Sequence, residues 1–134
     1  MQTDLQRRDK LILVIDDDPA YRELLAFALE GAGYEVLLAE NGAKGLNLAA
    51  REKPDAIVVD LIMPVMDGIR FLRALRNDVG SRVPAIVVTC DARRSSAIDA
   101  TVAGATEVLV KPVDPGALEE RIESALQAVR DALP

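Results

Sequence analysis

The sequence predicts an α/β protein in which a parallel five-stranded sheet is covered by helices on both faces. Short runs rich in β-branched residues occur at about 11–15, 34–39, 56–59, 84–89 and 107–110. The first, third and fourth runs are almost continuously apolar, which is typical of strands buried on both faces. Segments with helical periodicity follow each run, and this alternation indicates right-handed crossovers between parallel strands.

Each predicted helix is recognised by apolar residues three or four positions apart. The predicted buried faces are Tyr21, Leu24, Leu25, Ala28, Leu29 and Ala32; Ala43, Leu46, Ala49 and Ala50; Ile69, Leu72 and Leu75; Ala97, Ile98, Thr101 and Val102; and Leu118, Ile122, Ala125, Leu126, Val129 and Leu133. Gly31 or Gly33 is expected to end the first helix and Gly104 the fourth. Asp18 before Pro19 is typical of a helix N-cap.

Composition limits the possible functions. The 134 residues form one domain, and a net charge of −6 argues against direct nucleic-acid binding, which needs a basic face. Cys90 is the only cysteine, which excludes an internal disulfide and favours a reducing compartment. For Cys90 itself, a small buried apolar residue is favoured over a redox role. With neither a membrane-length apolar run nor a signal-peptide core, we expect a cytoplasmic protein without membrane insertion.

Polar side chains follow four of the predicted strands. They are Asp16, Asp17 and Asp18 after the first strand, Asp60 after the third, Thr89 at the end of the fourth and Lys111 after the fifth. Because the carboxyl ends of neighbouring parallel strands meet at one edge of a sheet, we expect these groups to lie together. Acids, a hydroxyl and an amine at one edge suit a metal ion and a phosphoryl group.

The acids also have a simpler interpretation as solvated loop residues. Helix capping explains Asp18, but neither Asp16 nor Asp17, and for that pair alone a metal site and a solvated loop are about equally favoured. Asp60 at a second strand end shifts the balance towards a metal site, since clustered carboxylates raise one another's pKa unless a cation compensates. Mg²⁺ suits such oxygen ligands best. Asp60 is then a candidate nucleophile towards phosphorus.

Taken together, these motifs resemble response-regulator receiver domains, the phosphoacceptor modules of two-component signalling, from about Lys10 to Leu133. The resemblance rests on residues 11–18, on Asp60 with Met63-Pro64 and Asp67-Gly68, on Thr89, on Gly104-Ala105 and on Lys111-Pro112. It implies a three-layer flavodoxin-like fold with strand order 2-1-3-4-5 and five helices. The expected receiver domain covers residues 10–134 and follows a flexible tail at residues 1–9.

The resemblance also implies a role for each site residue. Asp60 accepts a phosphoryl group from a sensor histidine kinase or a histidine phosphotransfer protein, which switches binding to an unknown downstream protein. Asp17, Asp60 and the backbone carbonyl of Ile62 bind Mg²⁺, and Asp16 acts mostly through metal-bound water. The other implied features are phosphoryl contacts from Thr89 and Lys111 and a cis Lys111–Pro112 bond. The protein can lose its own phosphoryl group but is not a turnover enzyme.

Two positions depart from the family pattern. Receivers usually have Tyr or Phe where this chain has Val108, and often Phe where it has Val113, so the usual coupling between hydroxyl and aromatic cannot operate in its common form. Ile62, two residues after Asp60, is apolar. We therefore expect that it positions no water and that the acyl phosphate is long-lived.

The sequence is open to three other interpretations. A receiver-shaped binding module whose switch has decayed is favoured by Val108 but opposed by the intact acids, hydroxyl and lysine. An aspartyl-phosphate phosphatase normally has an acid two residues after its nucleophile, where this chain has Ile62, so the sequence argues against it. Finally, the chain can be the receiver portion of a longer regulator.

Overall fold

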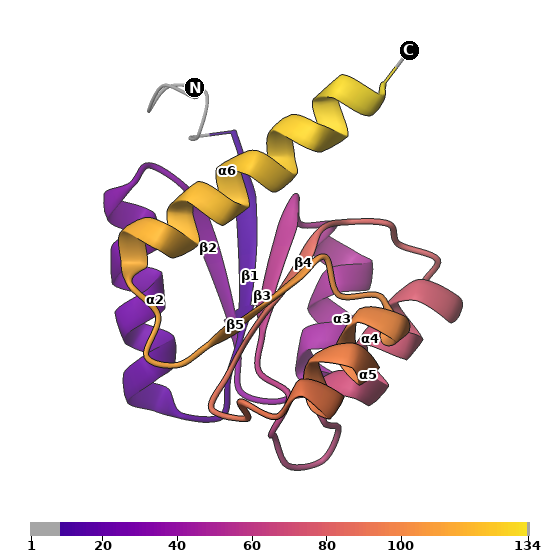
Figure 1. Cartoon of the computed structure of the whole chain (residues 1–134). Coiled ribbons are helices and arrows are strands. Elements are labelled where there is room, and N and C mark those ends of the chain that lie inside the picture. The colour runs from indigo at the N-terminus through magenta and orange to yellow at the C-terminus, as the bar shows by residue number, and fades with distance from the viewer. Residues whose placement is uncertain (1–8, 134) are drawn as a thin grey trace.

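The computed structural model describes residues 9–133 and contains the predicted alternation of strands and helices (Figure 1). The predicted flexible tail at residues 1–9 therefore lies outside the described residues, apart from Asp9. The elements are β1 (Leu11–Ile15), α2 (Pro19–Gly31), β2 (Glu35–Ala39), α3 (Gly42–Glu52), β3 (Ala56–Val59), α4 (Gly68–Asn77), β4 (Ala85–Thr89), α5 (Arg94–Ala103), β5 (Glu107–Val110) and α6 (Pro115–Ala132).

The sheet has the predicted order β2-β1-β3-β4-β5, and all of its strand pairs are parallel. Ile15 is paired with Val59, which in turn is paired with Val87. Backbone pairing continues beyond the strands, because the Asp60 N–H donates to the Ile15 carbonyl (3.1 Å). This register brings the carboxyl ends of β1, β3 and β4 to one edge.

The sheet separates two apolar layers, because successive residues along a strand face opposite sides. Strand residues such as Ile12 and Val14 pack with α2 and α6, whereas Leu13 and Ile15 pack towards α3, α4 and α5. Figure 1 shows these helix groups on opposite faces of the sheet. On the α2 and α6 side, the buried helical residues are Leu25, Leu29, Leu118, Ile122 and Leu126.

The helices begin where the sequence indicates. Asp18 accepts the N–H groups of Ala20 and Tyr21 at the start of α2, and Asp67 accepts that of Arg70 at the start of α4. Asn41 caps α3 in the same way. Each cap satisfies backbone N–H groups of the first turn that have no partner within the helix, which favours helix initiation at these positions.

Two predictions of burial were wrong. The predicted face of α5 is exposed, with Ile98 53% and Val102 80% accessible, and the helix buries Ala100 and Ala103 instead. Alanine gives a weak periodic signal, so the larger exposed residues suggested the wrong face. Cys90 is also exposed, because β4 ends at Thr89 and the chain turns outwards after it.

Three other predicted faces also contain exposed residues. They are Leu24 on α2, Ala50 on α3, and Val129 and Leu133 at the C-terminal end of the α6 face. No helix among the described residues is both long and apolar enough to span a bilayer.

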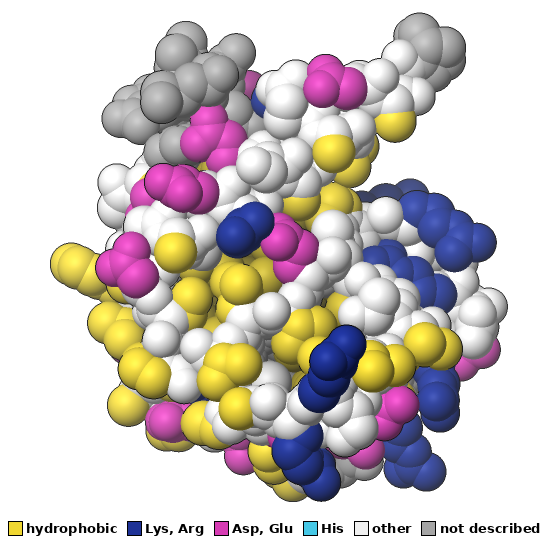
Figure 2. Space-filling model, in the orientation of Figure 1, with side chains coloured by type: hydrophobic (Ala, Val, Ile, Leu, Met, Phe, Trp, Pro, Cys, Tyr) yellow, Lys and Arg dark blue, Asp and Glu magenta, His cyan; other side chains and the backbone are white. Residues whose placement is uncertain are grey.

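Charge is unevenly distributed over the surface. Figure 2 shows most Lys and Arg side chains on the side that carries α3, α4 and α5 in Figure 1. The exposed arginines of α4, α5 and the loops before α5 are Arg70, Arg73, Arg82, Arg93 and Arg94. The net charge of −6 therefore does not describe this side of the molecule.

Candidate functional site

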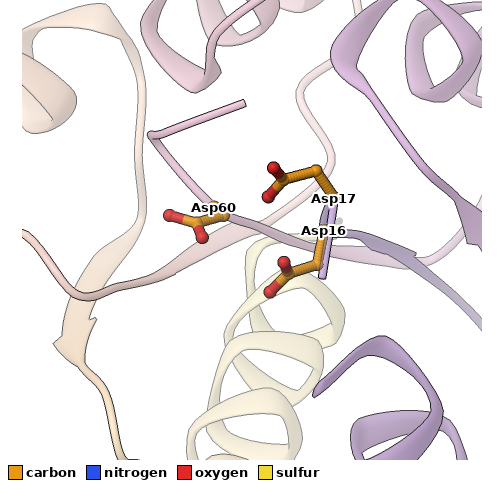
Figure 3. A group of neighbouring side chains, drawn as sticks. All are labelled: Asp16, Asp17 and Asp60. Carbon is orange, nitrogen blue, oxygen red and sulfur yellow. The ribbon is translucent and has the colours of Figure 1, made fainter. Parts of the chain in front are cut away.

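Three carboxylates lie together at the ends of β1 and β3 (Figure 3). One oxygen from each of Asp16, Asp17 and Asp60 can be chosen so that all three lie within 4.8 Å of one another. Asp16 is 1% and Asp60 6% accessible, whereas Asp17 is exposed. The structure thus brings the predicted acids together in a cluster in which Asp17 is the solvent-exposed member.

Lys111 links the two buried acids. Its Nζ lies 2.7 Å from Oδ2 of Asp16 and 3.0 Å from Oδ2 of Asp60. Burial by itself would lower the pKa of Lys111, but the hydrogen bonds to Asp16 and Asp60 outweigh it and raise the pKa above its ordinary value. Burial raises the pKa of Asp16, which the hydrogen bond from Lys111 offsets only in part.

Asp60 is held by the loop between β3 and α4. The Ile62 N–H donates to Oδ1 of Asp60 (3.2 Å), and the Gly68 N–H donates to the Leu61 carbonyl (2.9 Å). A Cβ on Gly68 would overlap the backbone oxygen of Asp60, so the loop can close this tightly only with glycine there. Gly68 therefore supports the position of Asp60.

The same loop contains a strained residue. Val65 has a φ of +70°, and the Met66 N–H donates to the Pro64 carbonyl (2.7 Å) across it. This is a γ-turn with its central residue in the left-handed region, where a β-branched side chain is disfavoured. The loop between Asp60 and α4 therefore adopts a defined backbone conformation that is energetically unfavourable at Val65.

Thr89 is completely buried at the end of β4. Its hydroxyl oxygen accepts the N–H of Asp91 (3.2 Å). Asp91 in turn accepts from Arg93 Nη2 (2.8 Å) and Ser96 Oγ (2.6 Å), and these hydrogen bonds hold the pKa of Asp91 well below its ordinary value. Thr89 is therefore connected through one loop to the start of α5.

The sequence assigned no site role to Tyr21, which contacts Lys111, with Lys111 Nζ 4.2 Å from the Tyr21 ring centroid. Asp91, two residues after Thr89, fixes the loop that follows it. One signal could have found Tyr21. It lies in the first turn of the helix that begins after Asp16 and Asp17, where side chains remain near the strand ends.

The remaining predicted features lie around this centre. The Lys111–Pro112 bond is cis, as predicted. Val108 on β5 is half-buried and packs with the cluster on the α3, α4 and α5 side. The Ile62 side chain points to solvent and is 59% accessible, and the role of its carbonyl as a metal ligand stays a prediction.

The pocket suits a hard divalent cation. Its donors are carboxylate oxygens, which Mg²⁺ prefers. Among residues 9–133, no hydrogen-bond donor or ion-pair partner contacts the Asp17 carboxylate, while Lys111 serves Asp16 and Asp60. Among the described residues Lys111 is the only cation paired with these carboxylates, and Arg22 donates through Nη1 to the backbone carbonyl of Asp16 (2.6 Å), so the Asp17 carboxylate is available to a bound cation.

Comparisons with known proteins identify the family. The family model described as the response regulator receiver domain matches residues 12–123. Protein PilH of Pseudomonas aeruginosa is 38% identical over 116 residues, which cover 86% of this chain and 96% of PilH. The KDP operon transcriptional regulatory protein KdpE of Escherichia coli is 43% identical over 116 residues, or 87% of this chain and 51% of KdpE.

Solved structures agree with this result. A CheY-like receiver domain protein from Methanospirillum hungatei has a TM-score of 0.86 at 30% identity, with 91% of this chain and 97% of that chain covered. The receiver domain of a sensor histidine kinase from Pseudomonas aeruginosa has a TM-score of 0.81 at 29% identity, with 88% and 98% covered. That structure contains a magnesium ion in the active-site cleft.

The chain therefore belongs to the response-regulator receiver domains of two-component signalling, as its motifs indicated. Receiver domains bind Mg²⁺ at an acidic pocket, interact with histidine kinases and downstream effectors, and are generally not turnover enzymes. The chain spans about half or less of several relatives that it matches, including 51% of KdpE and 26% of the regulatory protein GlrR of Escherichia coli.

Proposed function

We propose that Asp60 is the phosphoacceptor of a phosphorylation-switched receiver. The observation that supports this most directly is the Lys111 ammonium group, which bridges Asp16 and Asp60. A buried carboxylate next to a cation can accept a phosphoryl group without leaving the added negative charge uncompensated. The donor would be a sensor histidine kinase or a histidine phosphotransfer protein, and the phosphorylated form would bind a downstream protein.

The reaction forms one bond and breaks one. A carboxylate oxygen of Asp60 attacks the phosphorus of a phosphohistidine, and the P–N bond breaks as the P–O bond forms. The imidazole leaves and regains its proton from solvent as needed. Lys111 then exchanges its contact with Oδ2 of Asp60 for a phosphoryl oxygen, and the Thr89 hydroxyl donates to another.

Magnesium is part of this proposal. Asp17, Asp60 and the Ile62 carbonyl would hold the ion, with Asp16 acting through bound water. When bound, Mg²⁺ offsets the charge between the Asp60 carboxylate and the phosphoryl oxygens. We expect Mg²⁺ at 100 times its dissociation constant to raise the free energy of unfolding by about 2.7 kcal/mol. Urea denaturation should show this increase in the wild type, and Asp17→Asn should reduce it.

Intact mass measures phosphoryl transfer directly. With a small-molecule phosphodonor and Mg²⁺, we expect one phosphoryl adduct on the wild type and none on Asp60→Asn. Asp78→Asn, which changes an exposed acid at the end of α4, is the matched control and should be phosphorylated normally. If the wild type takes up no phosphoryl group from this donor or from a histidine kinase, the decayed-switch binding module becomes the better description.

The lifetime of the acyl phosphate is proposed to be long. The side chain of Ile62 is exposed beside Asp60 and has no polar atom with which to orient an attacking water. We expect Ile62→Asn to accelerate phosphate release, measured as the decay of the phosphoryl adduct after donor removal. Ile98→Asn, an equivalent change on exposed α5, should leave the decay unchanged. Equal decay in all three proteins would refute this idea.

The context of the domain is also a proposal. Similarity to PilH over nearly its whole length supports a single-domain receiver, whereas partial coverage of KdpE supports a receiver within a longer regulator. Both are compatible with the proposed cytoplasmic location. Size determination of the native protein by immunoblot of a cell extract distinguishes them.

A further inference from the structure

Tyr21 connects three parts of the site. It lies in the first turn of α2, and the cap at Asp18 fixes its backbone, since Oδ1 of Asp18 accepts the Ala20 N–H at 3.0 Å and the Tyr21 N–H at 3.4 Å. The side chain is half-buried and packs on the α2 and α6 side of the sheet, together with Val113. Its ring is therefore held in place beside Lys111 before any ligand binds.

Two contacts tie the β5–α6 loop to this one side chain. The Lys111 Nζ lies over the ring, 4.2 Å from its centroid, and the Val113 N–H donates to the Tyr21 hydroxyl oxygen at 3.2 Å. An ammonium group over the face of an aromatic ring is attracted by the ring quadrupole, and the attraction is stronger where water is excluded. The side chain of Lys111 is only 10% accessible, so it meets that condition.

Lysine needs such a restraint more than arginine does. Its ammonium group is a point charge at the end of a flexible four-carbon stem, so the two carboxylates alone leave several directions open to it. The Tyr21 ring adds a third contact to Nζ, beside those with the carboxylates of Asp16 and Asp60. The ammonium is thereby kept where it can reach a group on Asp60.

We propose that Tyr21 is a positioning residue for phosphoryl acceptance, whose ring holds the Lys111 ammonium group and whose hydroxyl transmits its displacement to Val113. The proposal rests on Asp60 being the phosphoacceptor. When Lys111 moves towards a phosphoryl oxygen, the contact with the ring changes, and the hydrogen bond to the β5–α6 loop adjusts with it. β5 carries Val108 where receivers usually have an aromatic residue. The proposed role would make Tyr21, on the α2 side of the site, the aromatic side chain that responds to phosphorylation.

Two substitutions separate the ring from the hydroxyl. Tyr21→Phe keeps the ring and loses only the acceptor for Val113, whereas Tyr21→Leu loses both. With acetyl phosphate and Mg²⁺, we expect the initial rate of adduct formation to stay within about twofold in Tyr21→Phe and to fall about 2- to 30-fold in Tyr21→Leu, as expected for a lost cation–π contact. Equal rates in all three proteins, or equal slowing in both variants, would overturn the positioning role of the ring.

Fluorescence gives a readout that a purely structural role would not change. The sequence contains two tyrosines and no tryptophan, so tyrosine emission is measurable, and Tyr34 is the only other contributor. Addition of beryllium fluoride and Mg²⁺, as a stand-in for the phosphoryl group, should change the emission of the wild type and leave Tyr21→Phe unchanged. An identical change in both would overturn the displacement of Lys111 relative to Tyr21.

The outcomes also distinguish this proposal from the one it rests on. If the wild type forms no phosphoryl adduct, the phosphoacceptor function fails and the role of Tyr21 fails with it. If the wild type and Tyr21→Leu form adducts at the same rate, only the role of Tyr21 fails. Urea denaturation of both variants identifies any rate loss that follows from unfolding, and Tyr21→Phe keeps the test valid if Tyr21→Leu does not fold.

Discussion

The α2 side of the site is packed with large side chains, whereas α5 is attached mainly by alanines. α2 buries Leu25 and Leu29 against the sheet, and α5 buries Ala100 and Ala103. Buried apolar area stabilises by about 25 cal/mol per Å², so the contacts of α5 with the sheet are worth much less. The difference indicates that α2 holds the site in place and that α5 is the element more easily displaced.

Polar contacts sharpen the same contrast. On the α2 side, Tyr21 touches Lys111 directly. On the α5 side, Thr89 is linked to the start of the helix through its hydrogen bond with Asp91 in the β4–α5 loop. The C-terminal end of α5 is held by Arg76 of α4, whose Nη2 donates to the Gly104 carbonyl (2.8 Å). α5 is thus fixed by hydrogen bonds at its two ends, which can be exchanged, more than by packing along its length.

The largest expected effect comes from the packing of α2. Leu29 is fully buried, and Leu29→Ala should lower the free energy of unfolding by about 2–5 kcal/mol through the lost contacts and the cavity left behind. Leu24→Ala on the same helix, where the side chain is 51% accessible, should cost less than about 1 kcal/mol. Urea denaturation measures both, and similar losses would contradict the packing described for α2.

A smaller effect is expected from the tether of α5. Arg76 donates through Nη1 to the carbonyls of Ser81 (3.1 Å) and Val83 (2.6 Å), and through Nη2 to that of Gly104 (2.8 Å). Arg76→Met keeps the aliphatic stem but leaves these half-buried carbonyls unpaired, which should cost about 1–3 kcal/mol. Native-state hydrogen exchange should show protection falling more in α5 than in α2.

Arg73→Met is the matched control for this substitution. Arg73 lies one turn earlier on α4 and is exposed, so its replacement should change stability by no more than about 0.5 kcal/mol. An equal loss of protection in α2 and α5 after Arg76→Met would show that Arg76 stabilises the whole fold and not α5 in particular.

The smallest effect is expected on the exposed face of α5. Val102→Ser removes an apolar side chain that is 80% accessible, so stability should change by no more than about 0.5 kcal/mol. Thermal unfolding followed by circular dichroism is sufficient to measure it. A loss above 1 kcal/mol would mean that Val102 packs within the fold, and α5 would then be attached more firmly than its alanines indicate.

The sequence predicted the sheet, and the gathering of the acids and Lys111 at one edge of it, because both depend on strong local signals. Strands such as Ala56–Val59 are buried on both faces and therefore read as continuous apolar runs, and Asp60 follows directly after one of them. Strand order and parallel pairing then bring the acids together with Lys111, which lies 95 residues from Asp16 in the sequence. The receiver motifs predicted the cis Lys111–Pro112 bond as well.

The errors occur where burial and residue size disagree. α5 packs through Ala100 and Ala103, while its larger residues Ile98 and Val102 face solvent. The contact between Tyr21 and Lys111 could not be predicted from spacing, since it depends on how α2 and the loop after β5 meet in space. The partners of Asp91 could not be predicted for a similar reason, because Arg93 and Ser96 reach its carboxylate only when the loop is folded.

The exposed Cys90 offers a practical consequence. It is the only cysteine among the 134 residues, and it directly follows the buried Thr89. A thiol-reactive fluorophore or spin label therefore attaches at one known position, without any substitution in the chain. Movement of the Thr89 backbone on phosphorylation would carry that label with it, and its mobility would report on the α5 side while Tyr21 emission reports on the α2 side.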